Sequence, residues 1–223
     1  MLRALLLGGM IAGTLPADGP SGARLLRQPD LSRDKVTFIH AGDLWTAPRR
    51  GGLAHRLTTT AEAESYPKFS PDGRWIAFSR RGDIYVVPSA GGAERWLTWH
   101  PSNDRVAGWT PDGRKLLVHS DRLRGALTEF PRLFLLALEG GTPEPLPMPR
   151  ATYGSFAPDG RRIAYGPNPE LVLWLPWKRY RGGSLGYIAI YDLERKEYQE
   201  LPRVAANDVC PMWHGNSIYL ASC

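Results

Sequence analysis

Short apolar runs alternate with turn residues along most of the chain, and one pattern of this kind returns at a regular spacing. It reads FSPDGRWIAF at 69–78, WTPDGRKLLV at 109–118 and FAPDGRRIAY at 156–165, with an eroded copy, MWHGNSIYL, at 212–220. Because proline presets φ and glycine accepts a positive φ, Pro-Asp-Gly predicts a tight turn between two β-strands. The three aspartates are spaced 40 and 47 residues apart, a period typical of propellers and solenoids.

A second pattern completes each repeat. GDLW at 42–45, GDIY at 82–85, PRLF at 131–134 and GYIA at 186–189 predict a third strand. In the first three copies a Gly-Gly turn and a short fourth strand follow, and no comparable window has helical periodicity. Four antiparallel strands, here called A to D, in about 40 residues are typical of a β-propeller blade. The predicted fold class is therefore all-β.

The number of repeats predicts an incomplete propeller. Strands B to D of a first blade are expected within 35–57, complete blades at 66–97, 105–146 and 152–201, and strands A and B of a fifth blade within 209–222. Propellers usually close with about 4–8 full blades. We therefore expect about four blades plus a hairpin whose edge is unpaired; a four-bladed ring with an extra hairpin is the alternative.

The longer repeats gain their extra residues between strands B and C, at 120–131 and 166–186. Insertions on one rim of a repeat fold are often the binding face. The second insertion is basic and aromatic, so we name four of its residues as candidate contacts for peptides or a partner: Trp177, Lys178, Arg179 and Arg181. A solvated loop, or one paired with a neighbouring domain, is the commoner role of such a charge run.

Three segments resemble one family. LSRDKV at 31–36, followed by GDLW and by RRGG at 49–52, is similar to the opening blade of tricorn-type proteases. WKRYRGG at 177–183, followed by IYDL, and PMWHG at 211–215, followed by IY, are similar to that family's fourth and fifth blades. The Pro-Asp-Gly-Arg repeats alone also resemble TolB-like and WD-type propellers.

The resemblance implies a fold and a function. It covers about 24–222 and implies part of a six-bladed N-terminal propeller, which helps to gate or release peptides in a large serine peptidase that degrades oligopeptides. The family's catalytic residues belong to segments that follow this region, so the resemblance implies none here. Peptides and the other domains or subunits of the peptidase are the implied partners.

No catalytic, cofactor or metal site is predicted from the residues themselves. GGSLG at 182–186 matches a nucleophile elbow, but neither the strand before it nor the helix after it is predicted. The five histidines lack metal-site spacing. Asp72, Asp112 and Asp159 are interpreted as turn residues, because an aspartate before glycine bonds its own backbone. Five tryptophans are interpreted as packing residues: Trp45, Trp75, Trp96, Trp109 and Trp213.

Composition and the N-terminus add the cellular context. The net charge of +6 shows no dense stripe and no nucleic-acid motif, so we expect no nucleic-acid partner. Residues 1–22 resemble a signal peptide that is too short to span a membrane, which predicts a periplasmic or secreted protein, with a cytoplasmic one as the alternative. The propeller domain is expected at 23–223. If the last turn pairs Trp213 with Ser217, Cys210 faces Leu220 and both cysteines are reduced.

Three functional classes follow. The first is the non-catalytic propeller of a tricorn-like serine peptidase, which by itself is expected to be inactive. The second is a TolB-like periplasmic interaction module without an enzymatic partner. The third is a propeller that precedes another hydrolase, such as a relative of prolyl oligopeptidase. They differ in what the gene encodes beyond Cys223.

Overall fold

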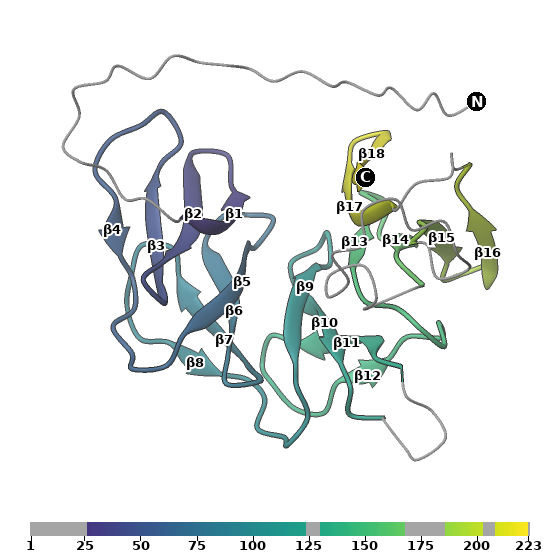
Figure 1. The fold of residues 1–223 in the computed structure, drawn as a ribbon, viewed down its shortest axis with the longest axis horizontal. Coiled ribbons are helices and arrows are strands. Elements are labelled where there is room, and N and C mark those ends of the chain that lie inside the picture. Colours follow the sequence, from purple (N-terminus) through teal and green to yellow (C-terminus); the bar gives the residue numbers. More distant parts are fainter. Residues whose placement is uncertain (1–25, 124–129, 168–185, 203–207, 223) are drawn as a thin grey trace.

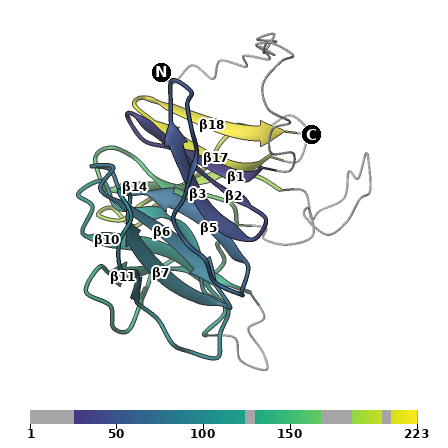
Figure 2. The ribbon, with the colours of Figure 1, turned by 90° about the vertical axis from the view of Figure 1, so that its left-hand side faces the viewer.

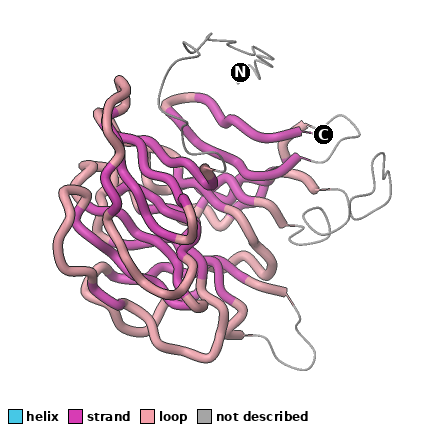
Figure 3. Tube along the Cα trace, turned by 60° about the vertical axis from the view of Figure 1, so that its left-hand side comes forward, coloured by secondary structure: helices cyan, strands magenta, loops and turns pink. Residues whose placement is uncertain are grey.

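Every regular element that the structure describes is a β-strand. The computed structural model describes residues 26–123, 130–167, 186–202 and 208–222, and within these ranges it contains 18 strands and no helix (Figure 3). Each strand pairs with its sequence neighbour in an antiparallel ladder. This confirms the predicted fold class.

The strands form four sheets of four strands and one hairpin, each built from consecutive elements. The sheets follow one another along an open arc (Figure 1), and Figure 2 shows β5, β6 and β7 side by side within one sheet. The first sheet contains β1 (Arg27–Leu31), β2 (Lys35–His40), β3 (Asp43–Pro48) and β4 (His55–Arg56), and the second contains β5 (Glu64–Phe69), β6 (Trp75–Arg80), β7 (Asp83–Pro88) and β8 (Arg95–Trp96). The third contains β9 (Arg105–Trp109), β10 (Lys115–Ser120), β11 (Arg132–Ala137) and β12 (Glu144–Pro145). The fourth contains β13 (Gly154–Phe156), β14 (Arg162–Tyr165), β15 (Ala189–Asp192) and β16 (Glu197–Glu200), and the hairpin contains β17 (Asp208–His214) and β18 (Ser217–Ser222).

The repeated sequence pattern marks equivalent positions in successive sheets. In each sheet an apolar residue near the end of strand A lies opposite the apolar residue near the start of strand B. The pairs are Phe69 with Ile76, Trp109 with Leu116, Phe156 with Ile163 and Trp213 with Ile218. The period in the sequence is therefore a period in space, and the structure is an incomplete β-propeller.

The Pro-Asp-Gly turns between strands A and B form as predicted. The Asp112 carboxylate accepts hydrogen bonds from the Thr110 hydroxyl at 2.6 Å and from the Arg114 backbone N–H at 3.0 Å. Asp72 makes both equivalent contacts, with Ser70 and the Arg74 N–H, whereas Asp159 accepts the Arg161 N–H but no hydroxyl bond, because residue 157 is alanine. These bonds hold the pKa of Asp112 below its ordinary value. The three aspartates are turn residues.

The core consists of apolar layers between neighbouring sheets. Ile39 and Leu44 of the first sheet pack with Phe78 of the second. Further layers lie between the second and third sheets and between the third and fourth sheets. Because each layer removes apolar side chains of two sheets from water, each sheet is stabilised mainly by its neighbours.

The first sheet differs from the sequence prediction because it has all four strands. We expected only strands B to D within 35–57, but β1 pairs with β2, and Leu31 lies opposite Val36. We did not predict this strand, because its residues are mostly polar and exposed and no Pro-Asp-Gly turn follows it. A turn closed by the Ser32 N–H and the Lys35 carbonyl takes its place.

The predicted packing role is wrong for one tryptophan. Trp96 is 51% exposed, whereas Trp109 is 8% exposed. Trp96 belongs to β8, the two-residue outermost strand of its sheet, where its ring stacks on Tyr85 but stays largely exposed. Trp45, Trp75 and Trp213 are half-buried.

The last hairpin has a shorter turn than predicted. Trp213 pairs with Ile218 and His214 with Ser217, so the turn holds two residues, and Gly215 has a φ of 56°. The register shifts between Val209 and Met212, and Cys210 has a φ of 54°. Val209 pairs with Ala221 and Met212 with Tyr219, so Cys210 lies opposite Leu220 as expected, but it shares this position with Pro211 in a bulge. Cys210 is a free, exposed thiol, and Cys223 lies outside the described residues.

Candidate functional site: the inner strands and the B–C rim

The A strands of neighbouring sheets lie against one another, and together they form the inner side of the arc. β1 contacts β5, β5 contacts β9, β9 contacts β13 and β13 contacts β17. Each is the end strand of its sheet, so one edge of every sheet faces this inner side (Figure 1). We call the five strands β1, β5, β9, β13 and β17 the inner wall. In a propeller such a wall lines the central channel.

Side chains of the preceding sheet satisfy backbone N–H groups of the inner wall. The N–H of Tyr66 donates to Gln28 Oε1 at 2.7 Å, and the N–H of Phe69 donates to Asp30 Oδ2 at 2.8 Å. Farther along the wall the acceptors are the hydroxyls of Ser79 and Ser155, which receive the N–H groups of Val106 and Trp213. An unpaired strand edge is thereby joined to its neighbour.

Three inner strands carry a bulge with the same unusual backbone. Gln28, Tyr66 and Cys210 have φ values of 50°, 54° and 54°, and each lies three residues before the last paired apolar residue of its strand. Residues other than glycine rarely adopt this conformation. Bulges of this kind re-aim side chains and often mark functional surfaces. The recurrence makes the inner wall the leading candidate for a functional surface.

Polar side chains of both charges are placed along the inner wall. Lys68 forms an ion pair with Asp30 at 2.9 Å, and both side chains are partly exposed. The Arg105 guanidinium lies 5.7 Å from the ring centroid of Tyr66. This mixture of donors, acceptors and an aromatic ring can contact a peptide backbone without requiring one particular sequence.

The connections between strands B and C differ in length from one sheet to the next. Strands B and C are joined by 41–42 and 81–82 in the first two sheets, but by 121–131 and 166–188 in the third and fourth. This confirms that the long repeats gain their residues there. Because the strands are antiparallel, the D-to-A connections between sheets lie at the same end. We call this end the B–C rim.

Where strand A starts, an acidic residue ties a sheet to the one before it. The backbone N–H of Glu64 donates to the Gly42 carbonyl at 2.8 Å, and that of Asp104 donates to the Gly82 carbonyl at 2.7 Å. Asp208 makes the same bond to Gly186 at 3.1 Å. We did not predict these acids. Their signal in the sequence is an acid five residues before Phe69, Trp109 and Trp213, the apolar residues near the end of each strand A.

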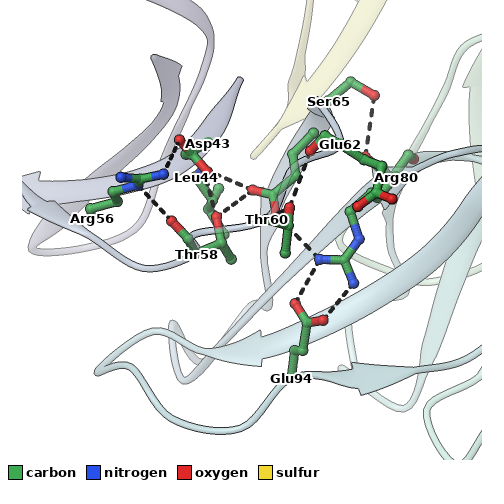
Figure 4. A network of polar contacts seen from close by, with 11 residues as sticks. Asp43, Leu44, Arg56, Thr58, Thr60, Glu62, Ser65, Arg80 and Glu94 are labelled. Carbon is green, nitrogen blue, oxygen red and sulfur yellow. Dashed lines mark hydrogen bonds and ion pairs between the residues drawn. The ribbon is translucent and has the colours of Figure 1, made fainter. Parts of the chain in front are cut away.

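Glu64 is the centre of a buried polar network between the first two sheets. Figure 4 labels its partners Leu44, Thr58 and Arg80. Its Oε2 accepts hydrogen bonds from the Leu44 N–H at 2.8 Å and the Thr58 hydroxyl at 2.5 Å. Its Oε1 lies 3.5 Å from Arg80, which also pairs with Glu94. Burial raises the pKa of Glu64, although the bonds from Thr58 and Leu44 oppose the shift. The network joins two sheets and leaves no oxygen of Glu64 without a donor.

A related network lies within the third sheet, next to the backbone bond that Asp104 makes to the second sheet. Asp104 is fully buried, accepts a hydrogen bond from the Ser120 hydroxyl at 2.5 Å and pairs with Arg122. Close by in β10, His119 is buried, and its Nε2 has no hydrogen-bond partner among the described residues. Burial, reinforced by Arg105, lowers the pKa of His119 to about 4. This histidine is therefore neutral at pH 7.

Within the described ranges, one serine–histidine contact closes a turn. His100 Nδ1 lies 2.8 Å from Ser102 Oγ, but it also accepts the backbone N–H of Ser102 at 3.1 Å. The two residues are separated by Pro101 alone, and the Ser102 hydroxyl lies 3.3 Å from Asp104. The contact closes the D-to-A connection of the second sheet.

The four candidate contact residues cannot be placed. Trp177, Lys178, Arg179 and Arg181 lie outside the described residues, as does Ser184 of the elbow-like sequence. Residues 1–22 lie outside them as well. Among the residues that are described, no three histidine, cysteine, aspartate or glutamate side chains are grouped to hold a metal ion, and no helix is long and apolar enough to cross a membrane.

The comparison with known families gives the decisive observation. Residues 23–222 match the family described as the tricorn protease N-terminal beta propeller domain. The chain belongs to this family. Tricorn protease homolog 1 of Streptomyces coelicolor is 31% identical to this tricorn-type propeller over 231 aligned residues, which cover 91% of the chain and 19% of that relative.

Solved structures agree with this assignment. The crystal structure of the tricorn protease matches with a TM-score of 0.75 and 28% identity, covering 89% of this chain and 20% of that protein. A TolB protein from Agrobacterium tumefaciens matches with a TM-score of 0.70 but 20% identity, which shows the fold alone. The tricorn-type propeller thus spans about a fifth of the length of its tricorn relatives.

Proposed function

We propose that this chain is the peptide-channel portion of a tricorn-like serine peptidase that degrades oligopeptides. In this proposal the inner wall guides peptides, the insertions of the B–C rim contact them at one end, and the catalytic domains are separate from these 223 residues. The other domains or subunits of the peptidase are its partners. The chain by itself is then inactive as a peptidase.

The observation that carries the proposal is the inner wall of a propeller that belongs to the tricorn family. Mixed charges, an aromatic ring and three bulges lie on the inner wall, and the sheet edges there are joined by Gln28 and Asp30. Such a surface suits extended chains of varied sequence, because it offers hydrogen bonds without a deep side-chain pocket. The same features would also serve the alternative, a TolB-like interaction module without peptidase partners.

Cys210 allows a direct test, because it is a free thiol on β17 of the inner wall. In a Cys223→Ser background, a mixture of oligopeptides should slow the alkylation of Cys210 by a maleimide, whereas free amino acids should not. Equal alkylation rates with and without peptides would overturn the channel assignment. Fluorogenic peptides should not be cleaved by the chain, and turnover that Ser184→Ala abolishes would show that the catalytic site is here after all.

We also propose that the protein is exported, since residues 1–22 have one basic residue, an apolar stretch and small residues in the order of a signal peptide. Expression of the full chain in a bacterium should yield periplasmic protein without these residues. Protein that keeps its N-terminus and stays in the cytoplasm would overturn this.

A further inference from the structure

A small pocket opens between the first and second sheets, far from the B–C rim. It measures about 260 Å³ and is lined by residues that include Lys35, Ala47, Pro48, His55, Leu57 and Ala90. Most of the surface that lines the pocket is apolar. Pockets that bury a drug-sized ligand usually start at about 300 Å³, so this one has room for a single side chain rather than a whole small molecule.

The surroundings of the pocket are basic. Lys35 lines it and donates from Nζ to the Ser89 carbonyl at 3.0 Å. Arg49 and Arg50 are exposed in the turn that directly follows β3. Within the part of the chain that the structure describes, these three cations form no ion pair, and Asp34 is the one carboxylate in the pocket lining. A group that binds here gains most if it is acidic.

An open strand edge lies beside the pocket. β4 is the last strand in the order of the first sheet, both of its residues are exposed, and His55 belongs to the pocket lining. Leu53, in the turn before β4, is 82% exposed. An extended segment can add to such an edge through backbone hydrogen bonds, while a neighbouring pocket takes one of its side chains.

We propose that this corner, formed by the pocket, the Arg49–Arg50 turn and the edge of β4, docks an extended acidic segment of a partner protein. One aliphatic side chain of the segment enters the pocket, and its carboxylates contact Lys35 and the two arginines. Charge complementarity selects this occupant over a second copy, because the chain carries a net charge of +6. The inference is independent of the inner wall and of peptide passage.

A designed probe tests the proposal on the full chain. A fluorescein-labelled peptide with one leucine flanked by glutamates should bind in fluorescence polarisation, more weakly as salt is added. The same peptide with glycine in place of leucine should bind at least about tenfold more weakly, and one with lysines in place of glutamates should not bind. In NMR titrations the amide shifts should centre on Ala47, Leu57 and Ala90.

Two variants and a matched control decide the location. Ala90→Trp fills the pocket from an exposed position, and Arg49→Glu combined with Arg50→Glu reverses the charge of the turn. Each should weaken the probe at least about tenfold. Arg114→Glu, an equally exposed turn arginine of the third sheet, should change affinity by less than about twofold.

Three results would overturn the docking site. They are an affinity that both variants leave unchanged, amide shifts that centre elsewhere, and a dimer of the chain that covers this corner at the concentrations used. Circular dichroism shows whether Ala90→Trp is folded; if it is not, the double arginine variant, which changes only exposed side chains, decides alone.

Discussion

Gly154, in β13 of the inner wall, lies against the core layer between the third and fourth sheets, and its replacement by alanine tests the packing directly. A Cβ added at this position would lie 2.7 Å from Leu133 Cδ1 and 2.9 Å from Leu117 Cδ2. Both leucines are fully buried, so neither can turn toward solvent. We expect Gly154→Ala to fold into the same structure with reduced stability.

The magnitude follows from the two close contacts. Ordinary van der Waals contact begins near 3.4 Å, so the two leucine methyl groups must each move by about half an ångström or more. Overpacking of a buried layer costs about 1–3 kcal/mol. Gly to Ala recovers about 0.4–1 kcal/mol by restricting the unfolded chain. At the middle of both ranges the net loss is about 1.3 kcal/mol, or roughly 3–5 °C in Tm for a domain of this size.

Gly108 in β9 is the matched control. A Cβ there would meet nothing nearer than the Gly154 carbonyl oxygen at 3.9 Å, so Gly108→Ala should be neutral or stabilising by up to about 1 kcal/mol. Guanidinium unfolding followed by tryptophan fluorescence measures both variants, and circular dichroism shows that each keeps its strands.

A second substitution identifies the cause. Leu133→Val removes the methyl group nearest to the new Cβ, so in the Gly154→Ala background it should cost less than it does alone. Equal stability of the two glycine variants, or purely additive effects of Gly154→Ala and Leu133→Val, would refute the packing argument.

Three further predictions concern polar groups. Glu64→Ala should lower the free energy of unfolding by about 2–4 kcal/mol, because it leaves buried hydrogen-bond donors without an acceptor. Glu62→Ala removes only an exposed ion pair and should cost less than about 1 kcal/mol in the same denaturant assay. The pKa of His119 is lowered to about 4 from an ordinary 6.5, so the unfolded chain binds more protons between these values and stability is lost as pH falls through them; His119→Gln should lessen that loss between pH 7 and pH 4.5, and an unchanged loss would contradict it. Asp112→Ala removes two turn bonds and should lower Tm by a few degrees, about 1 kcal/mol, in a thermal melt; an unchanged Tm would contradict this.

The sequence predicted the repeating sheets because their turns are encoded locally. Pro-Asp-Gly predicts the conformation of three of the A–B turns from three adjacent residues, and the apolar residues on either side set the register, as with Phe69 and Ile76. β1 escaped prediction because its polar residues carry no such pattern. Its strand conformation depends on pairing with β2, which is a tertiary effect.

The candidate site was less accessible to sequence reasoning. The network of Glu64 joins groups from two sheets, and no local pattern states that Leu44 and Thr58 will lie beside that carboxylate. Trp96 was misjudged because a strand's place at the outer edge of a sheet is a property of the whole fold. The roles of Trp177, Lys178, Arg179 and Arg181 remain predictions.

The hydrogen bonds along the inner wall have a direction that bears on how the chain is synthesised. At Gln28, Asp30, Ser79 and Ser155 the acceptor precedes in the sequence the amide that it receives. During synthesis the side-chain acceptor is therefore made before the strand whose amide binds to it. Shortening the chain from its C-terminal end removes the amide donors and leaves the serine hydroxyls, which water can hydrate. Removing β1 would instead leave bare the amides of Tyr66 and Phe69. The chain should thus tolerate truncation from its C-terminal end much better than removal of β1.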